Sequence, residues 1–191
     1  PRANAAGTLR ELKRIGVRRT VLLTGDNSRV GKKVARDLGI DEVRSDLMPE
    51  DKVTAIRQIA AGEVVAMVGD GVNDAPALAA ASVGVAMGGA GTDVALETAD
   101  VALMGDDLGK LPFAVGLGRA TRAIVLQNIA ISMAVIGFLI ATSILGVVGI
   151  SVAILFHEGS TLLVVANSLR LLMFGDGASA VAGAGVADDV T

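Results

Sequence analysis

The sequence contains no cysteine, tryptophan or tyrosine, and four phenylalanines are its only aromatic residues. Without cysteine, the chain can make neither a disulfide nor a thiolate metal site from its own residues. It also has no basic run, and its net charge is −3. Nucleic-acid binding needs cations that neutralise phosphates or aromatic rings that stack on bases. We therefore expect no nucleic-acid partner.

Charge is absent from a long stretch of the second half. No charged residue occurs from Ala123 through Phe156, a run of 34 residues. Because about 20 apolar residues suffice to cross a bilayer, this run must contain a break, and Gly146 and Gly149 mark its place. We expect two membrane helices, near residues 123–145 and 150–174.

Basic residues flank the two expected spans. Arg119 and Arg122 precede the first, Arg170 lies near the end of the second, and the turn between them has no charge. The positive-inside rule then places both chain ends in the cytoplasm. We expect an integral protein of the plasma or inner membrane, in contact with the lipid bilayer, with a disordered tail over residues 175–191.

The first part of the chain alternates helical and short apolar patterns. Helices are expected over 5–15, 28–38 and 92–98 and from Pro49 and Asn73, and strands over 20–23, 64–68, 83–87 and 101–104. This doubly wound α/β pattern is typical of a parallel sheet covered by helices, with functional groups at the carboxyl ends of the strands. We expect a cytosolic domain over residues 1–118 and a two-helix hairpin over 119–174.

Three short segments of this domain suit phosphoryl transfer: Thr24-Gly25-Asp26 and Asp70 to Asp74 each follow a strand, and Lys52 lies in the first turn of a helix. Such a site needs a carboxylate for Mg²⁺, a cation to offset phosphate charge and neutral donors to position the oxygens. Asp70 can hold the metal, Lys52 can offset charge, and Thr24 and Asn73 can donate. Taken singly, each segment is also explained as an ordinary turn or surface residue. We interpret Gly88 to Gly91 as a linker because it lacks the Lys-Ser/Thr of a phosphate-binding loop.

The long string from Met67 to Leu78 resembles the P-type ATPases of the haloacid-dehalogenase-like superfamily, whose phosphorylation domain is Rossmann-like. Residues 24–27, 49–52, 69–78 and 91–95 carry the likeness. The resemblance implies that Asp70 is the Mg²⁺ ligand and that Asn73 and Asp74 help to position phosphate and metal. It also implies that Lys52 contacts the phosphoryl group, and that Thr24 hydrogen-bonds to it with Gly25 and Asp26 nearby.

One departure from the family concerns the nucleophile. The family's phosphorylated residue is the Asp of Asp-Lys-Thr-Gly, and no Asp in this sequence precedes Lys-Thr-Gly. We expect the chain to be the C-terminal part of a longer pump, with ATP bound mainly by a domain outside it. The chain alone should be inactive, and acid-stable labelling by ATP would contradict this.

His157 and Glu158 are the only ionisable residues well inside either span. Such residues are costly in a membrane and usually mark a transport path or a paired partner. Ser160 and Thr161 follow on the same helix, so we expect these four residues to bind the transported ion. Nitrogen and oxygen ligands suit divalent first-row metals and disfavour Cu(I). We expect Gln127 and Asn128, in the first span, to hydrogen-bond to neighbouring helices.

Residues 157–161 resemble the His-Glu-Gly-x-Thr signature of cobalt-type heavy-metal pumps, some of which also move Zn²⁺ or Fe²⁺. The zinc/cadmium/lead group instead carries an Asp at the position of His157 and a Lys near Ile136. The leading hypothesis is ATP-driven export of a divalent transition metal of the Co²⁺/Zn²⁺ type. A zinc/cadmium/lead pump, a membrane-anchored haloacid-dehalogenase-like phosphatase and a truncated non-catalytic product remain as alternatives.

Overall fold

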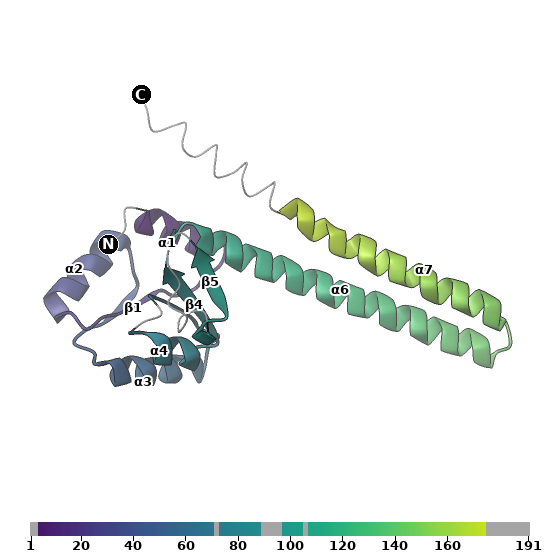
Figure 1. Ribbon diagram of the computed structural model, residues 1–191, viewed down its shortest axis with the longest axis horizontal. Coiled ribbons are helices and arrows are strands. Elements are labelled where there is room, and N and C mark those ends of the chain that lie inside the picture. The colour runs from purple at the N-terminus through teal and green to yellow at the C-terminus, as the bar shows by residue number, and fades with distance from the viewer. Residues whose placement is uncertain (1–3, 71–72, 89–96, 105–106, 175–191) are drawn as a thin grey trace, which may run out of the picture. The chain divides into compact units, whose positions relative to one another are not determined.

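The computed structural model of the chain describes residues 4–70, 73–88, 97–104 and 107–174 (Figure 1). It forms two compact units, which divide between Pro112 and Phe113. The predicted Gly88 to Gly91 linker, most of the predicted helix 92–98 and the predicted tail 175–191 lie outside the described residues.

The first unit alternates helices and strands, as the sequence pattern predicts. The elements are α1 (Ala5–Arg14), β1 (Val21–Leu23), α2 (Ser28–Leu38), β2 (Glu42–Arg44), α3 (Pro49–Ala60), β3 (Ala66–Gly69), α4 (Ala75–Ala80), β4 (Val83–Gly88) and β5 (Val101–Met104). Strand β2 was not predicted. Its neighbours in the chain are polar, and three residues with two charged ends show no apolar strand pattern.

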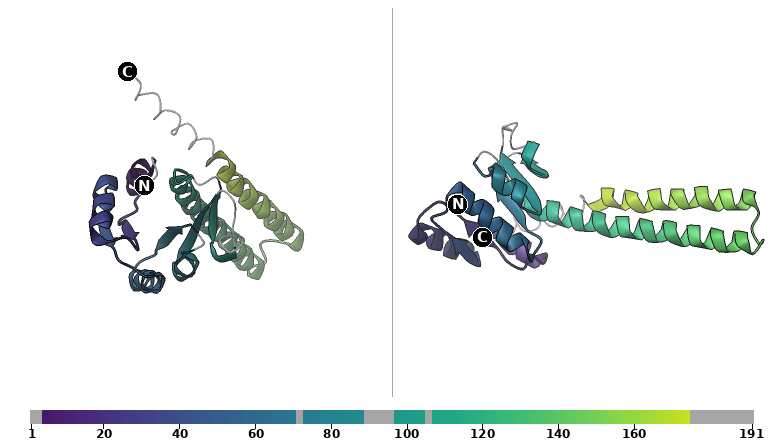
Figure 2. Two further views of the ribbon diagram at one scale, coloured as in Figure 1. Left: turned by 60° about the vertical axis from the view of Figure 1, so that its left-hand side comes forward. Right: turned by 90° about the horizontal axis from the view of Figure 1, so that it is seen from below.

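All strand pairs are parallel, but the strands form two separate sheets. β1 pairs with β2 in one sheet, and the other sheet has the order β3-β4-β5. In the described part of the chain, no strand pairs with the second edge of β1 or of β3. Figure 2 shows the strands from two further sides. The predicted parallel arrangement is confirmed, but the described residues form two sheets and not a single one.

Local signals fix where the helices of this unit begin and end. Asn27 Oδ1 accepts a hydrogen bond from Val30 N at 3.1 Å at the start of α2, as an N-cap residue does. Gly39 ends α2 with a φ of 70°, a conformation open to glycine. Pro49 opens α3, and Asp51 Oδ2 accepts from Met48 N at 3.0 Å.

The hydrophobic core lies between the helices and the larger sheet. Leu78 of α4 is 1 % exposed and packs with Ala86 of β4, and Met67 and Ala99 pack against both. Ile56 of α3 is also buried, and α3 packs against α4. This core supports the carboxyl end of β3.

The second unit is a helical hairpin formed by α6 (Lys110–Ile144), α7 (Ile150–Leu169) and the short 3₁₀ helix η1 (Arg170–Met173). Gly146, with a φ of 69°, lies in the connecting turn, as predicted. Both helices are long and apolar enough to span a membrane. Helix α6 begins at Lys110, well before the predicted start of the first span. Its 35 residues extend about 50 Å, which is more than the roughly 30 Å of hydrocarbon, so a span occupies only part of the helix.

The ion pair between Lys13 and Asp41 gives a prediction for stability. Asp41 accepts from Lys13 Nζ at 2.6 Å and from the hydroxyl and backbone N–H of Thr20, and these bonds lower the pKa of Asp41 from 3.8 to about 2. A lowered folded-state pKa stabilises the fold above pH about 4, and this contribution is lost as the pH falls to about 2. The two side chains are 38 % and 40 % exposed, so the ion pair contributes no more than about 1 kcal/mol.

We therefore expect Asp41→Asn to lower the denaturation midpoint of the first unit at pH 7, with the difference from the unmodified chain shrinking below pH 4. Denaturant titrations between pH 2 and 7 measure this. Asp37→Asn is the matched control, because the Asp37 side chain makes no ion pair in the described part of the chain. A difference between Asp41→Asn and the unmodified chain that stays constant down to pH 2 would contradict the assignment.

Candidate functional site

The loop Thr24-Gly25-Asp26 lies directly after β1 and is closed by its own hydrogen bonds. Thr24 Oγ1 accepts from Asp26 N at 3.0 Å and donates to Asp26 Oδ2 at 3.2 Å. A Cβ atom on Gly25 would lie 3.2 Å from Leu47 O, so only glycine fits here without displacing the neighbouring backbone. The loop thus holds a hydroxyl and a carboxylate together at the carboxyl end of a strand.

The segment after β2 supports this loop, and the sequence analysis missed it. Asp46 N donates to Asp26 O at 2.9 Å, and Leu47 N donates to Thr24 O at 3.1 Å. Asp46 has a φ of 57°, which Asp tolerates better than most residues. The one signal in the sequence was an Asp that follows a serine, which is too common to identify such a support.

Lys52, in the first turn of α3, forms an ion pair with Asp74 at the start of α4. Lys52 Nζ lies 2.7 Å from Asp74 Oδ1, and the side chains are 19 % and 16 % exposed. By resemblance, Lys52 was expected to contact the phosphoryl group, and Asp74 was expected to help to position phosphate and metal. The structure joins them, so Asp74 holds the ammonium group in place and offsets part of its charge.

Gly69 leaves room for the Asp74 side chain. A Cβ on Gly69 would lie 2.9 Å from both Cβ and Oδ2 of Asp74. Because Gly69 ends β3, the absence of a side chain there lets Asp74 approach the carboxyl end of the strand. The position of the Lys52–Asp74 pair therefore depends on this glycine.

Asp70 follows β3 and is exposed. Its Oδ1 accepts from Asn73 N at 3.3 Å. Mg²⁺ is commonly held by one or two carboxylates, with water and substrate phosphates completing its shell. In the described residues no three His, Cys, Asp or Glu residues cluster. One exposed carboxylate beside a lysine nevertheless fits a magnesium site of this kind.

The structure thus brings together four of the predicted residues at the end of β3, namely Lys52, Asp70, Asn73 and Asp74. Thr24 and Asp26 form a second group at the end of β1, and no hydrogen bond joins either of them to Lys52 or Asp74 in the described part of the chain. The two groups lie at the carboxyl ends of strands that belong to different sheets.

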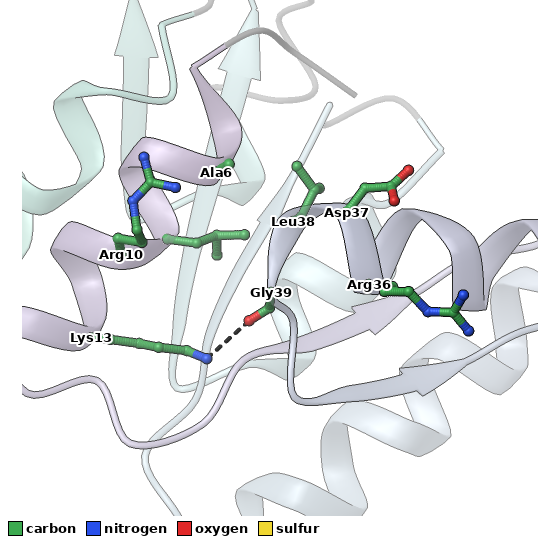
Figure 3. Close-up of a pocket in the computed structure, with 8 residues that line it drawn as sticks. Ala6, Arg10, Lys13, Arg36, Asp37, Leu38 and Gly39 are labelled. Carbon is green, nitrogen blue, oxygen red and sulfur yellow. Dashed lines mark hydrogen bonds between the residues drawn. The ribbon is translucent and has the colours of Figure 1, made fainter.

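A cavity of about 310 Å³ lies elsewhere in the first unit, between α1 and α2 (Figure 3). Arg10 and Lys13 of α1 and Arg36 and Asp37 of α2 are on its rim, and Lys13 Nζ donates to Gly39 O at 2.9 Å. None of the predicted site residues lines this cavity. It is separate from the phosphate chemistry.

The predicted ion ligands lie on α7, but they do not all face the same way. Ser160 Oγ donates to His157 O at 2.6 Å, and Thr161 Oγ1 donates to the same oxygen at 3.4 Å. Successive helical residues are about 100° apart, so His157, Glu158 and Thr161 share one face about 100° wide. Ser160 instead lines a cavity with Val135 of α6.

Several known proteins are similar to this chain in sequence. A family profile described as haloacid dehalogenase-like hydrolase matches residues 1–82. The chain is 48 % identical over 178 residues to the cadmium-transporting ATPase of Staphylococcus aureus, covering 92 % of the chain and 24 % of that protein. It is 47 % identical over 157 residues to the probable cation-transporting ATPase G of Mycobacterium tuberculosis (strain ATCC 25618 / H37Rv), covering 82 % of the chain and 20 % of that protein.

Solved structures agree with the sequence relatives. A crystal structure of a zinc-transporting PIB-type ATPase in the E2.Pi state matches with a TM-score of 0.83 and 48 % identity, over 90 % of this chain and 28 % of that one. The catalytic domain of the CPx-ATPase CopB-B matches with a TM-score of 0.53 and 42 % identity, over 60 % of this chain and 46 % of that one. The chain spans about a quarter of the length of the curated relatives it matches. Over the part that it spans, the chain is thus similar in sequence and fold to heavy-metal P-type ATPases.

Proposed function

We propose that this chain is the C-terminal part of a pump that exports a divalent transition-metal ion of the Co²⁺/Zn²⁺ type and works through an aspartyl-phosphate. The observation that carries the proposal is the half-buried Lys52–Asp74 pair beside the exposed Asp70, at the carboxyl end of β3. A fixed cation near an exposed carboxylate is an arrangement that suits phosphoryl transfer.

Each residue of the phosphate site has one task in this proposal. Asp70 would hold Mg²⁺, which offsets negative charge on the phosphoryl oxygens when it is bound. Lys52 directs its ammonium group at the same oxygens, and Asp74 keeps that group in position. Thr24 Oγ1 and Asn73 act as neutral donors that orient the phosphoryl group.

The nucleophile would come from the rest of the pump. β1 and β3 each have a second edge without a partner strand in the described residues, and both site groups lie at the carboxyl ends of these two strands. A parallel strand that pairs with both edges would bring its own carboxyl end between Thr24 and Asp70. By resemblance the nucleophile is the Asp of an Asp-Lys-Thr-Gly segment, which in this proposal lies at the carboxyl end of that strand.

The choice of metal rests on α7. His157, Glu158 and Thr161 offer nitrogen and oxygen ligands on one face, which suits divalent first-row ions. His157 stands where the zinc/cadmium/lead group, by resemblance, carries an Asp, and this favours the cobalt-type group. Several relatives are named as cadmium-transporting ATPases, so a zinc/cadmium pump is the second candidate. In both cases the lipid bilayer and the amino-terminal part of the same pump are partners, and both ends of this chain are cytoplasmic.

Gly69→Ala tests the phosphate site. The added Cβ would meet Asp74 at 2.9 Å and displace the partner of Lys52, so we expect phosphoenzyme formation by the full-length pump to slow by about tenfold to 100-fold. Acid-stable labelling with ATP measures the rate. Gly62→Ala is the matched control, because a Cβ there meets nothing within 4 Å. Equal rates for Gly69→Ala, Gly62→Ala and the unmodified pump would show that the Lys52–Asp74 geometry does not matter for this step.

His157→Ala tests the ion site. Loss of one ligand should raise the metal concentration that half-maximally stimulates phosphorylation by about tenfold to 100-fold. Titrations with Co²⁺, Zn²⁺ and Cd²⁺ in the full-length pump measure this and separate the two candidate pump types. Ser160→Ala should have a smaller effect, because its hydroxyl already bonds to His157 O and lines the cavity next to α6. If His157→Ala has no effect with any metal, a membrane-anchored phosphatase becomes the better account.

A further inference from the structure

A group of amide and hydroxyl side chains lies at one end of the helical hairpin. On α6 they follow Arg122, and at the end of α7 they precede Arg170. We call this set of four residues the polar clamp: Gln127 and Asn128 of α6, and Asn167 and Ser168 of α7. The two helices run side by side in opposite directions in Figures 1 and 2, which brings these two pairs together.

Hydrogen bonds connect the polar clamp across the two helices. Asn167 Nδ2 donates to Asn128 Oδ1 at 2.8 Å and to Gln127 Oε1 at 3.3 Å. Asn128 Nδ2 donates in turn to Ser168 Oγ at 2.9 Å. An amide nitrogen carries two hydrogens, so Asn167 uses both of its own to hold α6. The expected hydrogen bonding of Gln127 and Asn128 to a neighbouring helix is thereby confirmed.

Groups outside the interface complete the network. Ser168 Oγ donates to Val164 O at 2.9 Å, and Arg170 Nη1 donates to Asn167 Oδ1 at 3.0 Å. In both Asn128 and Asn167, the side-chain nitrogen therefore donates a hydrogen bond and the side-chain oxygen accepts one. A shift of α7 by one helical turn, about 5.4 Å, would break the cross-helix bonds and leave these groups in an apolar surrounding.

The middle of the hairpin has little else to fix its register. A cavity of about 420 Å³ lies between the helices, lined by Val135 on α6 and by Phe156, Gly159 and Ser160 among others on α7. One ring contact, between Phe138 and Phe156 with centroids 6.2 Å apart, is found there. Apolar side chains gain little by leaving lipid for each other. Polar bonds and close packing must therefore set the register.

We propose that the polar clamp is a positioning device that fixes the register of α7 against α6 and so holds His157 and Glu158 at their depth. This rests on the proposed function of α7 as an ion-binding helix. Ser168 and His157 belong to the same uninterrupted helix, and eleven residues separate them by about 16 Å. A rigid helix transmits a fixed register over this distance.

The first experiment measures the coupling within the chain itself. Asn128→Leu, Asn167→Leu and the double variant are unfolded in SDS titrations of the 191-residue chain in micelles. We expect each single variant to lower the midpoint, and the double variant to lower it no further than the larger single change, because the two residues act through one bond network. Ser168→Ala removes a single acceptor, so its SDS midpoint should lie between those of the Asn→Leu variants and that of the unmodified chain. It serves as a variant that folds.

The second experiment measures the positioning role in the full-length pump. Asn167→Leu should raise the Co²⁺ or Zn²⁺ concentration for half-maximal phosphorylation by about tenfold, with the rate at saturating metal retained. Thr142→Val is the control, since Thr142 Oγ1 bonds only to carbonyl groups of its own helix, at 2.8 and 3.2 Å. We expect no change for it.

The outcomes separate the two proposals. Additive midpoint losses in the double variant would overturn the polar clamp, whatever the pump does. Coupled losses with an unchanged metal requirement in Asn167→Leu would overturn its positioning role. If no metal stimulates the unmodified pump, the proposed function fails, and the SDS coupling still decides whether the polar clamp exists.

Discussion

The ion pair between Lys52 and Asp74 is the interaction on which the arrangement of the first unit depends. Strands β1 and β2 form one sheet and β3 to β5 another, so no ladder of backbone hydrogen bonds joins these halves in the described residues. The packing of α3 on α4 joins them instead, and the ion pair spans the same two helices. Both side chains are less than one fifth exposed, so removing either partner would leave a poorly solvated charge.

The same pair gives the site its chemistry. It places an ammonium group at the carboxyl end of β3, next to Asp70, and Gly69 provides the space that this placement requires. The Thr24 loop lies at the end of β1 and is shaped by the segment around Asp46. Each half of the site is therefore built by its own sheet, and a strand between the sheets would complete both. In the second unit His157, Glu158 and Thr161 of α7 are likewise exposed, so the proposed ion site would also be completed by the rest of the pump.

Sequence patterns were sufficient where the signal is local. The end of α2 at Gly39 and the start of α3 at Pro49 follow from the preferences of single residues. The glycine break between the membrane helices was also predictable, from composition and length. Strand β2 was missed because its residues have no apolar pattern. The start of α6 at Lys110 was not predicted, because Arg119 and Arg122 indicate a membrane edge and not a helix end.

Tertiary relations within the site could not be predicted in the same way. Lys52 and Asp74 are 22 residues apart, and nothing in their spacing indicates that α3 and α4 pack together. Ser160 and Thr161 looked equivalent as ligands because both lie one turn from His157. Their difference arises from the position of α6, which Ser160 faces. In both cases the sequence identified the residues, and the structure supplied their contacts.

The most direct test of this account is hydrogen exchange at the two open strand edges, β1 (Val21–Leu23) and β3 (Ala66–Gly69). Exchange is compared between the 191-residue chain and the full-length pump, with β4, which is paired on both sides, as the internal reference. The account predicts fast exchange at β1 and β3 in the chain alone and strong protection in the full-length pump, with β4 unchanged. Equal protection of β1 and β3 in both proteins would contradict it, because no strand from the rest of the pump would then complete the site.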